Sequence, residues 1–212
     1  MKTMKLGLAI AISLGLAACG GDEPATTQPA EAPPTAPAPA PATEPAPPMP
    51  DAHDAHAAAG TAMAHVELAP TEGNAVRGSL MFTSENGAVR LNGAITGLEP
   101  GSRRGFHIHE HGDCSAPDAM SAGGHWNPTG EDHGRRSHGE FHAGDMDNLE
   151  ADDNGNAAVD MLLAGLEIGT GSDMDVVGQS VIVHTGTDDY ESQPTGDAGG
   201  RAACGVIEIH EG

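Results

Sequence analysis

The sequence predicts an all-β domain in residues 61–212, built from antiparallel strands that form a sandwich or a barrel. From His65 onward, short runs alternate apolar and polar residues with a period of two, as strands with one buried face do. Gly, Asn, Asp and Pro separate these runs, and no stretch of comparable length carries a helical apolar stripe. Seven or eight strands in about 150 residues are typical of an antiparallel sandwich or barrel.

The predicted strands follow one another with turn signals between them, at residues 64–69, 76–83, 88–96, 105–110, 157–163, 180–185 and 205–210. Between the fourth and fifth of them, residues 112–149 are rich in Gly, His and Asp and show no strand pattern. A loop of this length inside a compact domain is usually functional. Something other than a hydrophobic core must order it.

The composition argues against one class of function and favours another. The chain has 212 residues and a formal net charge of −22, which argues against nucleic-acid binding. The chain has twelve histidines but only nine Lys and Arg residues in total. A chain that concentrates imidazole in this way is a candidate for metal binding.

The N-terminus predicts export. Lys2 and Lys5 precede an apolar stretch, residues 6–18, that is shorter than the roughly 20 residues of a membrane-spanning helix but suits a signal peptide. We expect residues 1–18 to be a signal peptide of the lipoprotein type, because Leu-Ala-Ala-Cys ending at Cys19 resembles the bacterial lipidation box. Cleavage at an ordinary signal site is the alternative. Gly20 after the cysteine favours anchoring in the outer membrane over inner-membrane retention.

Residues 19–60 are predicted to be a lipidated N-terminus followed by a disordered linker. Eleven of the sixteen prolines fall between Pro24 and Pro50, among Ala, Thr and Glu, and such a segment has no apolar pattern to bury. Near its end, His53 and His56 could capture metal weakly or could simply be solvated.

The remaining histidines form a pattern that predicts two metal sites. Strand alternation places His107 and His109 on one face, where two imidazoles can converge on one ion. The long loop and a late strand end add further ligand types: His125, His133, His142, Asp145 and His184. Three imidazoles and a carboxylate suit zinc, whereas an all-imidazole group suits copper. Seven ligands for two metals require a shared one, and an imidazole can bridge through its two nitrogens. The alternative is an acidic loop that carries histidines by chance.

These residues resemble the copper/zinc superoxide dismutase family, in its bacterial periplasmic branch. The matching segments cover roughly residues 64–210 and read GFHIHEHGDC from Gly105, GHWNP from Gly124, HAGD from His142, SVIVH from Ser180 and GRAACGVI from Gly200. The resemblance implies an eight-stranded antiparallel Greek-key barrel with long metal-binding and electrostatic loops. It also implies copper and zinc as cofactors and superoxide as substrate.

The resemblance assigns roles position by position. Copper ligands are His107, His109, His125 and His184; zinc ligands are His125, His133, His142 and Asp145. Asp188, favoured by spacing over Asp189, is expected to bond one histidine of each metal. Cys114 and Cys204 are expected to form a disulfide, and Arg201 to orient the anion beside copper, with His125 handling a proton.

The expected function is therefore superoxide dismutation by a lipid-tethered enzyme that protects the periplasm and cell envelope. A non-catalytic copper-binding or copper-delivery module on the same fold is the alternative. Monomer and homodimer both stay open. Trp126 stands where the family usually has Phe or Tyr, and His138 could compete with His133 for zinc. Three histidines are expected to lie on the surface: His65, His111 and His210. Four arginines are expected to be solvated, with steering of the substrate anion as the alternative: Arg103, Arg104, Arg135 and Arg136.

Overall fold

The computed structural model describes residues 61–211. The predicted signal peptide (1–18), lipidated Cys19 and linker (19–60), including His53 and His56, lie outside the described residues. In residues 61–211, no helix combines the length and the apolar content that crossing a membrane requires.

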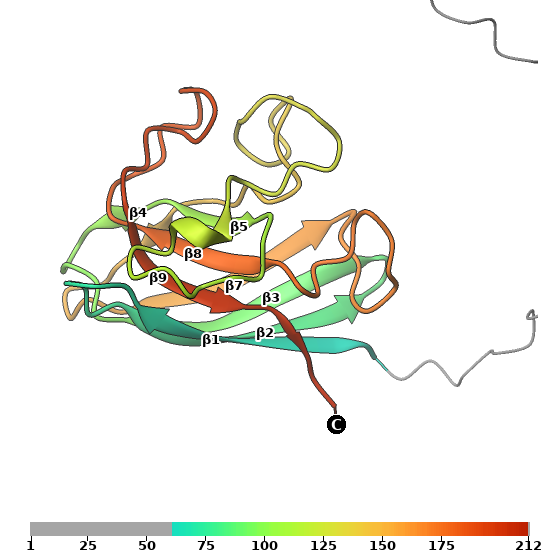
Figure 1. The fold of residues 1–212 in the computed structure, drawn as a ribbon, viewed down its shortest axis with the longest axis horizontal. Coiled ribbons are helices and arrows are strands. Elements are labelled where there is room, and N and C mark those ends of the chain that lie inside the picture. The colour runs from blue at the N-terminus through green and yellow to red at the C-terminus, as the bar shows by residue number, and fades with distance from the viewer. Residues whose placement is uncertain (1–60, 212) are drawn as a thin grey trace, which may run out of the picture. The chain divides into compact units, whose positions relative to one another are not determined.

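The described chain is an all-β domain, as predicted (Figure 1). Its only helical element within residues 61–211 is a short 3₁₀ turn, η1 (Met120–Ala122). The strands are β1 (Met63–Pro70), β2 (Arg77–Glu85), β3 (Ala88–Thr96), β4 (Arg103–Arg104), β5 (Phe106–His109), β6 (Leu149–Glu150), β7 (Ala157–Ala164), β8 (Ser180–His184), β9 (Arg201–Val206) and β10 (Glu208–Ile209).

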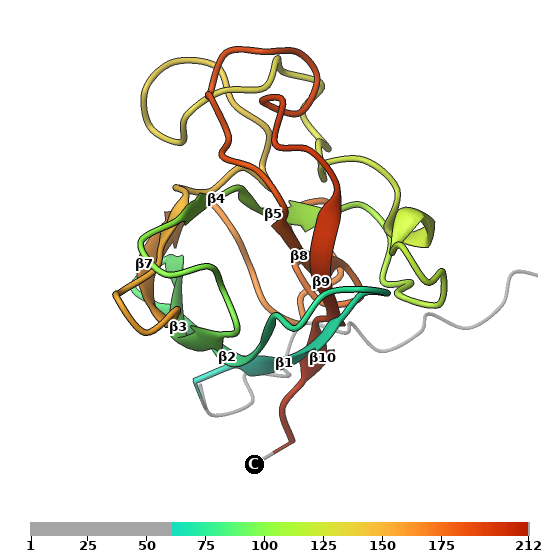
Figure 2. The same ribbon diagram turned by 90° about the vertical axis from the view of Figure 1, so that its left-hand side faces the viewer.

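One antiparallel sheet dominates the domain and curls into a half-barrel (Figure 2). Its strand order is β5-β8-β9-β1-β2-β3-β7, and β10 adds to one end of β1. The short strands β4 and β6 pair separately. Strands β1 and β9 are neighbours in the sheet although they are distant in sequence, so long connections cross between parts of the sheet, in agreement with the expected Greek-key topology.

The core lies inside this curl because the strands alternate. In β1, Ala64, Val66 and Leu68 are buried whereas His65 and Glu67 face outward. The inward side chains of β2, β3 and β7 join them, among them Leu80, Phe82, Leu91, Ile95, Val159 and Leu163. Removing these side chains from water supplies the main stabilising free energy of the sheet.

The strand expected at residues 205–210 differs from the one observed. It begins earlier, at Arg201, and a break at Ile207 separates β9 from β10. Small residues fill most of β9 and give little alternation, and they are buried on both faces. The two-residue strands β4 and β6 were also beyond pattern analysis, since a period of two needs more than two residues.

Two long irregular segments, residues 110–148 and 185–200, leave the sheet on the same side and lie next to each other (Figures 1 and 2). The first was expected to lack strands, and it contains only η1. Both start from strands that carry predicted ligands, β5 and β8.

Candidate metal centre

Strand β5 carries the first two histidines of the centre. Phe106 and Ile108 point into the hydrophobic core. His107 and His109 alternate with them, and their ring centroids lie 6.5 Å apart. All four residues are buried, and backbone of the 110–148 segment pairs with β5 through isolated antiparallel bridges at Asp145 and His125.

Four histidines gather around one point at the end of β5 and β8. Their ligand nitrogens all lie within 4.8 Å of one another, and all four residues are buried: His107, His109, His125 and His184. Nε2 of His109 and Nε2 of His184 face each other at 3.3 Å. This is the set to which the resemblance assigns copper.

A second group gathers around the carboxylate of Asp145, which is fully buried. Its Oδ1 lies 2.8 Å from Nδ1 of His125, 3.0 Å from Nδ1 of His133 and 3.5 Å from Nδ1 of His142. Backbone N–H groups of Gly134 and His142 donate to Oδ2 and fix the carboxylate's orientation. These four residues form the set to which the resemblance assigns zinc.

His125 belongs to both groups. Its Nδ1 faces Asp145, and its Nε2 is buried without a hydrogen-bond partner. Its ring centroid is 3.9 Å from that of His107 and 5.5 Å from that of His142. The two ring nitrogens of one imidazole are therefore directed to two different ligand groups.

The donor atoms fit two resident metal ions. Buried side-chain atoms that lack a partner in the described residues include ring nitrogens of His107, His125 and His142. A buried polar atom without a partner costs roughly 1–3 kcal/mol, and a metal bond would satisfy it. Four imidazoles are a donor set that copper accepts, and three imidazoles with one carboxylate form a common zinc set.

Burial prepares three of the histidines as ligands. It lowers the pKa of His125 to about 4 and that of His184 to about 3, and it holds the pKa of His109 well below its usual value. Although burial opposes it, hydrogen bonds from His125 and His133, together with the nearby ring of His142, hold the pKa of Asp145 well below its usual range. Neutral imidazoles and an ionised carboxylate are the protonation states that bind metal.

Asp188 connects the two groups. Its Oδ2 lies 2.8 Å from Nε2 of His107, and its Oδ1 lies 3.1 Å from Nε2 of His133. The side-chain amide of Asn148 exchanges two hydrogen bonds with the backbone of Asp188, each 2.9 Å long. The aspartate favoured by spacing thus contacts one histidine from each group, while Asp189 faces the exposed turn that follows it.

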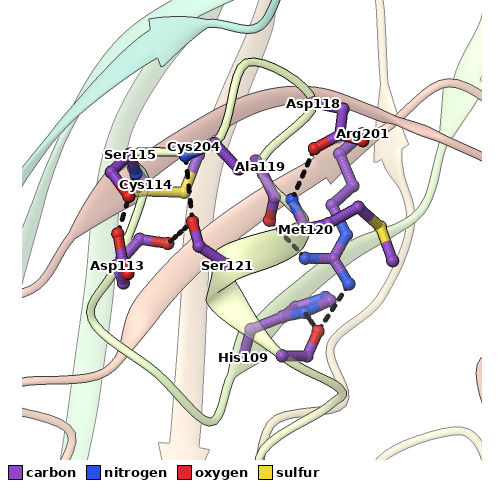
Figure 3. Close-up of a disulfide and its surroundings, with 12 residues drawn as sticks. His109, Asp113, Cys114, Ser115, Asp118, Ala119, Met120, Ser121, Arg201 and Cys204 are labelled. Carbon is purple, nitrogen blue, oxygen red and sulfur yellow. Dashed lines mark hydrogen bonds between the residues drawn. A yellow bond between two sulfur atoms is a disulfide. The ribbon is translucent and has the colours of Figure 1, made fainter.

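Arg201 lies beside the copper-type group at the start of β9 (Figure 3). Its two terminal nitrogens donate to the backbone carbonyls of Ala119 and Gly123. The Gly123 carbonyl is also 3.0 Å from Nδ1 of His109. One carbonyl therefore links the guanidinium to a predicted copper ligand.

The predicted disulfide is present. Cys114 and Cys204 are bonded, with Cα atoms 5.8 Å apart (Figure 3). Cys204 is in β9, three residues after Arg201, and Cys114 is in the segment that supplies the carbonyls to Arg201. Ser121 donates to the carbonyl of Asp113 and tightens the same segment.

Arg136 differs from the sequence expectation of a solvated side chain. It is half-buried and donates from Nε to the carbonyl of Asp145 at 2.9 Å, and also to the carbonyls of Ala143 and Ala164. Its long stem reaches across the turn that carries His142 and Asp145. Spacing could not reveal this role, because the acceptors are backbone atoms.

Several histidines stay outside the centre. Neither ligand group includes His65, His111, His138 or His210. His138 is exposed, so the site geometry gives it no place beside His133. Trp126 is buried in the main core.

An all-β protein in which two loops enclose two ligand groups with a shared imidazole is a binuclear metalloprotein. A model of the copper/zinc superoxide dismutase family matches residues 76–207. The chain belongs to the copper/zinc superoxide dismutase family, and its cofactors are copper and zinc.

Similar proteins agree with this assignment. Cu-Zn superoxide dismutase 2 of Aquifex aeolicus is 41% identical over 148 residues, which cover 68% of this chain and 85% of the relative. The superoxide dismutase-like protein YojM of Bacillus subtilis is 36% identical, over 68% of this chain and 74% of its own length. The crystal structure of the clock protein EA4 has a TM-score of 0.63 and 37% identity, covering 71% of this chain and 96% of that one.

Proposed function

We propose that this chain is a superoxide dismutase that converts two superoxide anions and two protons into O₂ and H₂O₂. The observation that carries the proposal is the buried imidazole of His125, whose two nitrogens serve two ligand groups while Arg201 stands beside the first. When bound, copper would supply one-electron oxidation and reduction, and zinc, held by His125, His133, His142 and Asp145, would undergo no redox change.

The protein residues have three tasks in this reaction. Nε2 of His125 has no other partner, so it can hold a proton and pass it to the reduced substrate. A second proton comes from solvent. Nδ1 of the same ring faces Asp145 and the zinc-type group, which leaves Nε2 directed at the copper-type group.

Arg201 binds and orients the anion. Desolvation lowers the pKa of its guanidinium, but arginine stays charged at any physiological pH. The backbone carbonyls of Ala119 and Gly123 accept its hydrogen bonds and hold the planar guanidinium in place without neutralising its charge. The remaining N–H groups are free to meet a small anion.

The decisive test is superoxide dismutation by the purified chain after loading with copper and zinc. Wild type is compared with His125→Ala and Arg201→Ala, and His138→Ala serves as the matched control for an exposed histidine. We expect activity in wild type and control, near-complete loss in the first variant and a loss of more than about 10-fold in the second. Tight copper binding without turnover in wild type would favour the copper-carrier alternative and refute the proposal.

The proposed location is the periplasm, with the enzyme tethered to the outer membrane by lipid on Cys19. The support is the N-terminal sequence: two lysines, a short apolar stretch, and a cysteine after Leu-Ala-Ala. Mass spectrometry of the mature N-terminus tests this. An unmodified N-terminus at another residue would contradict it.

A further inference from the structure

We infer that Gln193 is a positioning residue for zinc: its side-chain amide clamps the peptide groups of His133 and so fixes one zinc ligand from the neighbouring loop. This inference rests on the assignment of His133 as a zinc ligand. Neither the motif spacing nor the ligand groups point to Gln193.

The clamp consists of two hydrogen bonds. The backbone N–H of His133 donates to Oε1 of Gln193 at 2.9 Å, and Nε2 of Gln193 donates to the backbone carbonyl of His133 at 2.8 Å. Both lengths are within the usual range for N–H···O bonds. A neighbouring β-strand would form the same pair of hydrogen bonds with a single residue. Here one side-chain amide satisfies both the N–H and the carbonyl of His133.

His133 needs such support because no strand holds it. It lies in the irregular 110–148 segment, yet its side chain is fully buried. Its ring contacts Asp145 through Nδ1 at 3.0 Å and Asp188 through Nε2 at 3.1 Å. A small rotation of the His133 backbone would break both contacts, and zinc sites demand close control of ligand position.

Gln193 links the two long loops at this point. It belongs to residues 185–200, the segment that also carries Asp188 and therefore contacts the copper-type group through His107. Gly196 lies in the same segment, with no side chain, packed against the His133 ring and Asp188. The clamp thus ties the zinc ligand to the loop that borders the copper-type group. By linkage, ordering either loop favours the ordered state of the other.

The exposure of Gln193 distinguishes positioning from a general structural role. The residue is exposed and buries little apolar surface, so its replacement acts through the two hydrogen bonds to His133 and not through lost core packing. Outer-sphere partners of metal ligands typically change metal affinity by about 10- to 100-fold when removed. We therefore expect the zinc affinity of Gln193→Ala to fall at least about 10-fold.

The experiment is a zinc titration of the full chain against a colorimetric chelator. Gln193→Ala is compared with Gln193→Glu, which keeps an acceptor for the His133 N–H but presents no donor to the carbonyl. Glu191→Gln is the matched control, an exposed residue of the same loop. We expect both Gln193 variants to weaken zinc and to shift the visible spectrum of the cobalt-substituted site, while the control matches wild type. Affinity within twofold of wild type in Gln193→Ala would overturn the inference.

A second measurement needs no variant. In the zinc-loaded wild-type chain, the His133 amide should exchange with solvent deuterium at least about 100-fold more slowly than an unstructured amide, because Gln193 accepts its hydrogen bond. Exchange at the unprotected rate would overturn the inference. Both readouts are independent of superoxide. If wild type failed to dismutate but Gln193→Ala weakened zinc, the proposed function would fall and the clamp would stand.

Discussion

Removing the disulfide by Cys114→Ala with Cys204→Ala should destabilise the metal-free chain by about 4–5 kcal/mol. The two cysteines are 90 residues apart in sequence. Closing a loop of this length removes about 15 cal/mol/K from the entropy of the unfolded chain, or about 4.6 kcal/mol at 25 °C. Cys204 belongs to a small buried cluster with Ala119, Ala122 and Ile182, and the partly buried Cys114 packs against it.

The assay is urea unfolding of the oxidised wild type and the double variant, both stripped of metal. The free energy in water, from linear extrapolation, should drop by the stated amount. A loss below about 2 kcal/mol would refute the chain-entropy reasoning, since it would mean that the unfolded chain gains little freedom. The same variant frees the segment that supplies two carbonyls to Arg201, so its metal-loaded form should also show a higher KM for superoxide.

Three further predictions concern the site. Arg201→Lys keeps the positive charge but loses the planar guanidinium that two backbone carbonyls hold, so kcat/KM should fall about 10-fold while its salt dependence persists. An unchanged kcat/KM would contradict the orienting role of Arg201. Gly196→Ala would force a Cβ into Asp188 at a backbone φ of +67°, so urea unfolding should show a loss of at least about 2 kcal/mol, together with low zinc content; normal zinc content would refute this. The metal-free chain should be most stable near pH 6.5. Burial lowers the pKa of His125 to about 4, so the unfolded state binds more protons below pH 6.5 and roughly 3 kcal/mol is lost on acidification to pH 4. Although burial opposes it, hydrogen bonds to two aspartates raise the pKa of His133 to about 9, so stability also falls between pH 6.5 and 9. Urea midpoints that stay level between pH 4 and 6.5 would contradict the His125 shift, and midpoints that keep rising from pH 6.5 to 9 would contradict the His133 shift.

The residues that gather in the two groups could be singled out from sequence because few residue types bind metal, whereas their assignment to copper and to zinc came from the family resemblance. Strand alternation put His107 and His109 on one face, and the structure shows them there. The long strands β1, β2, β3 and β7 were predictable for the same reason: they bury one face and expose the other.

The supporting residues could not be predicted. The side-chain amides of Gln193 and Asn148 hydrogen-bond to backbone atoms 60 and 40 residues away in the sequence. Such contacts produce no periodicity or fixed spacing that sequence analysis could detect. Arg136 was expected in solvent, because a long cationic side chain usually extends there. Its burial depends on three carbonyls that only the folded turn brings together.

The loop that carries the metal ligands also protects an edge of the sheet. β5 is the terminal strand of the main sheet, and backbone of the loop pairs with it: Ile108 donates to the Gly144 carbonyl, and Trp126 donates to the Ile108 carbonyl. An uncovered edge strand is a template for pairing with other molecules. Displacement of this loop would therefore expose backbone groups that can pair with a second copy of the chain. Because the same loop carries metal ligands, loss of metal would favour self-association.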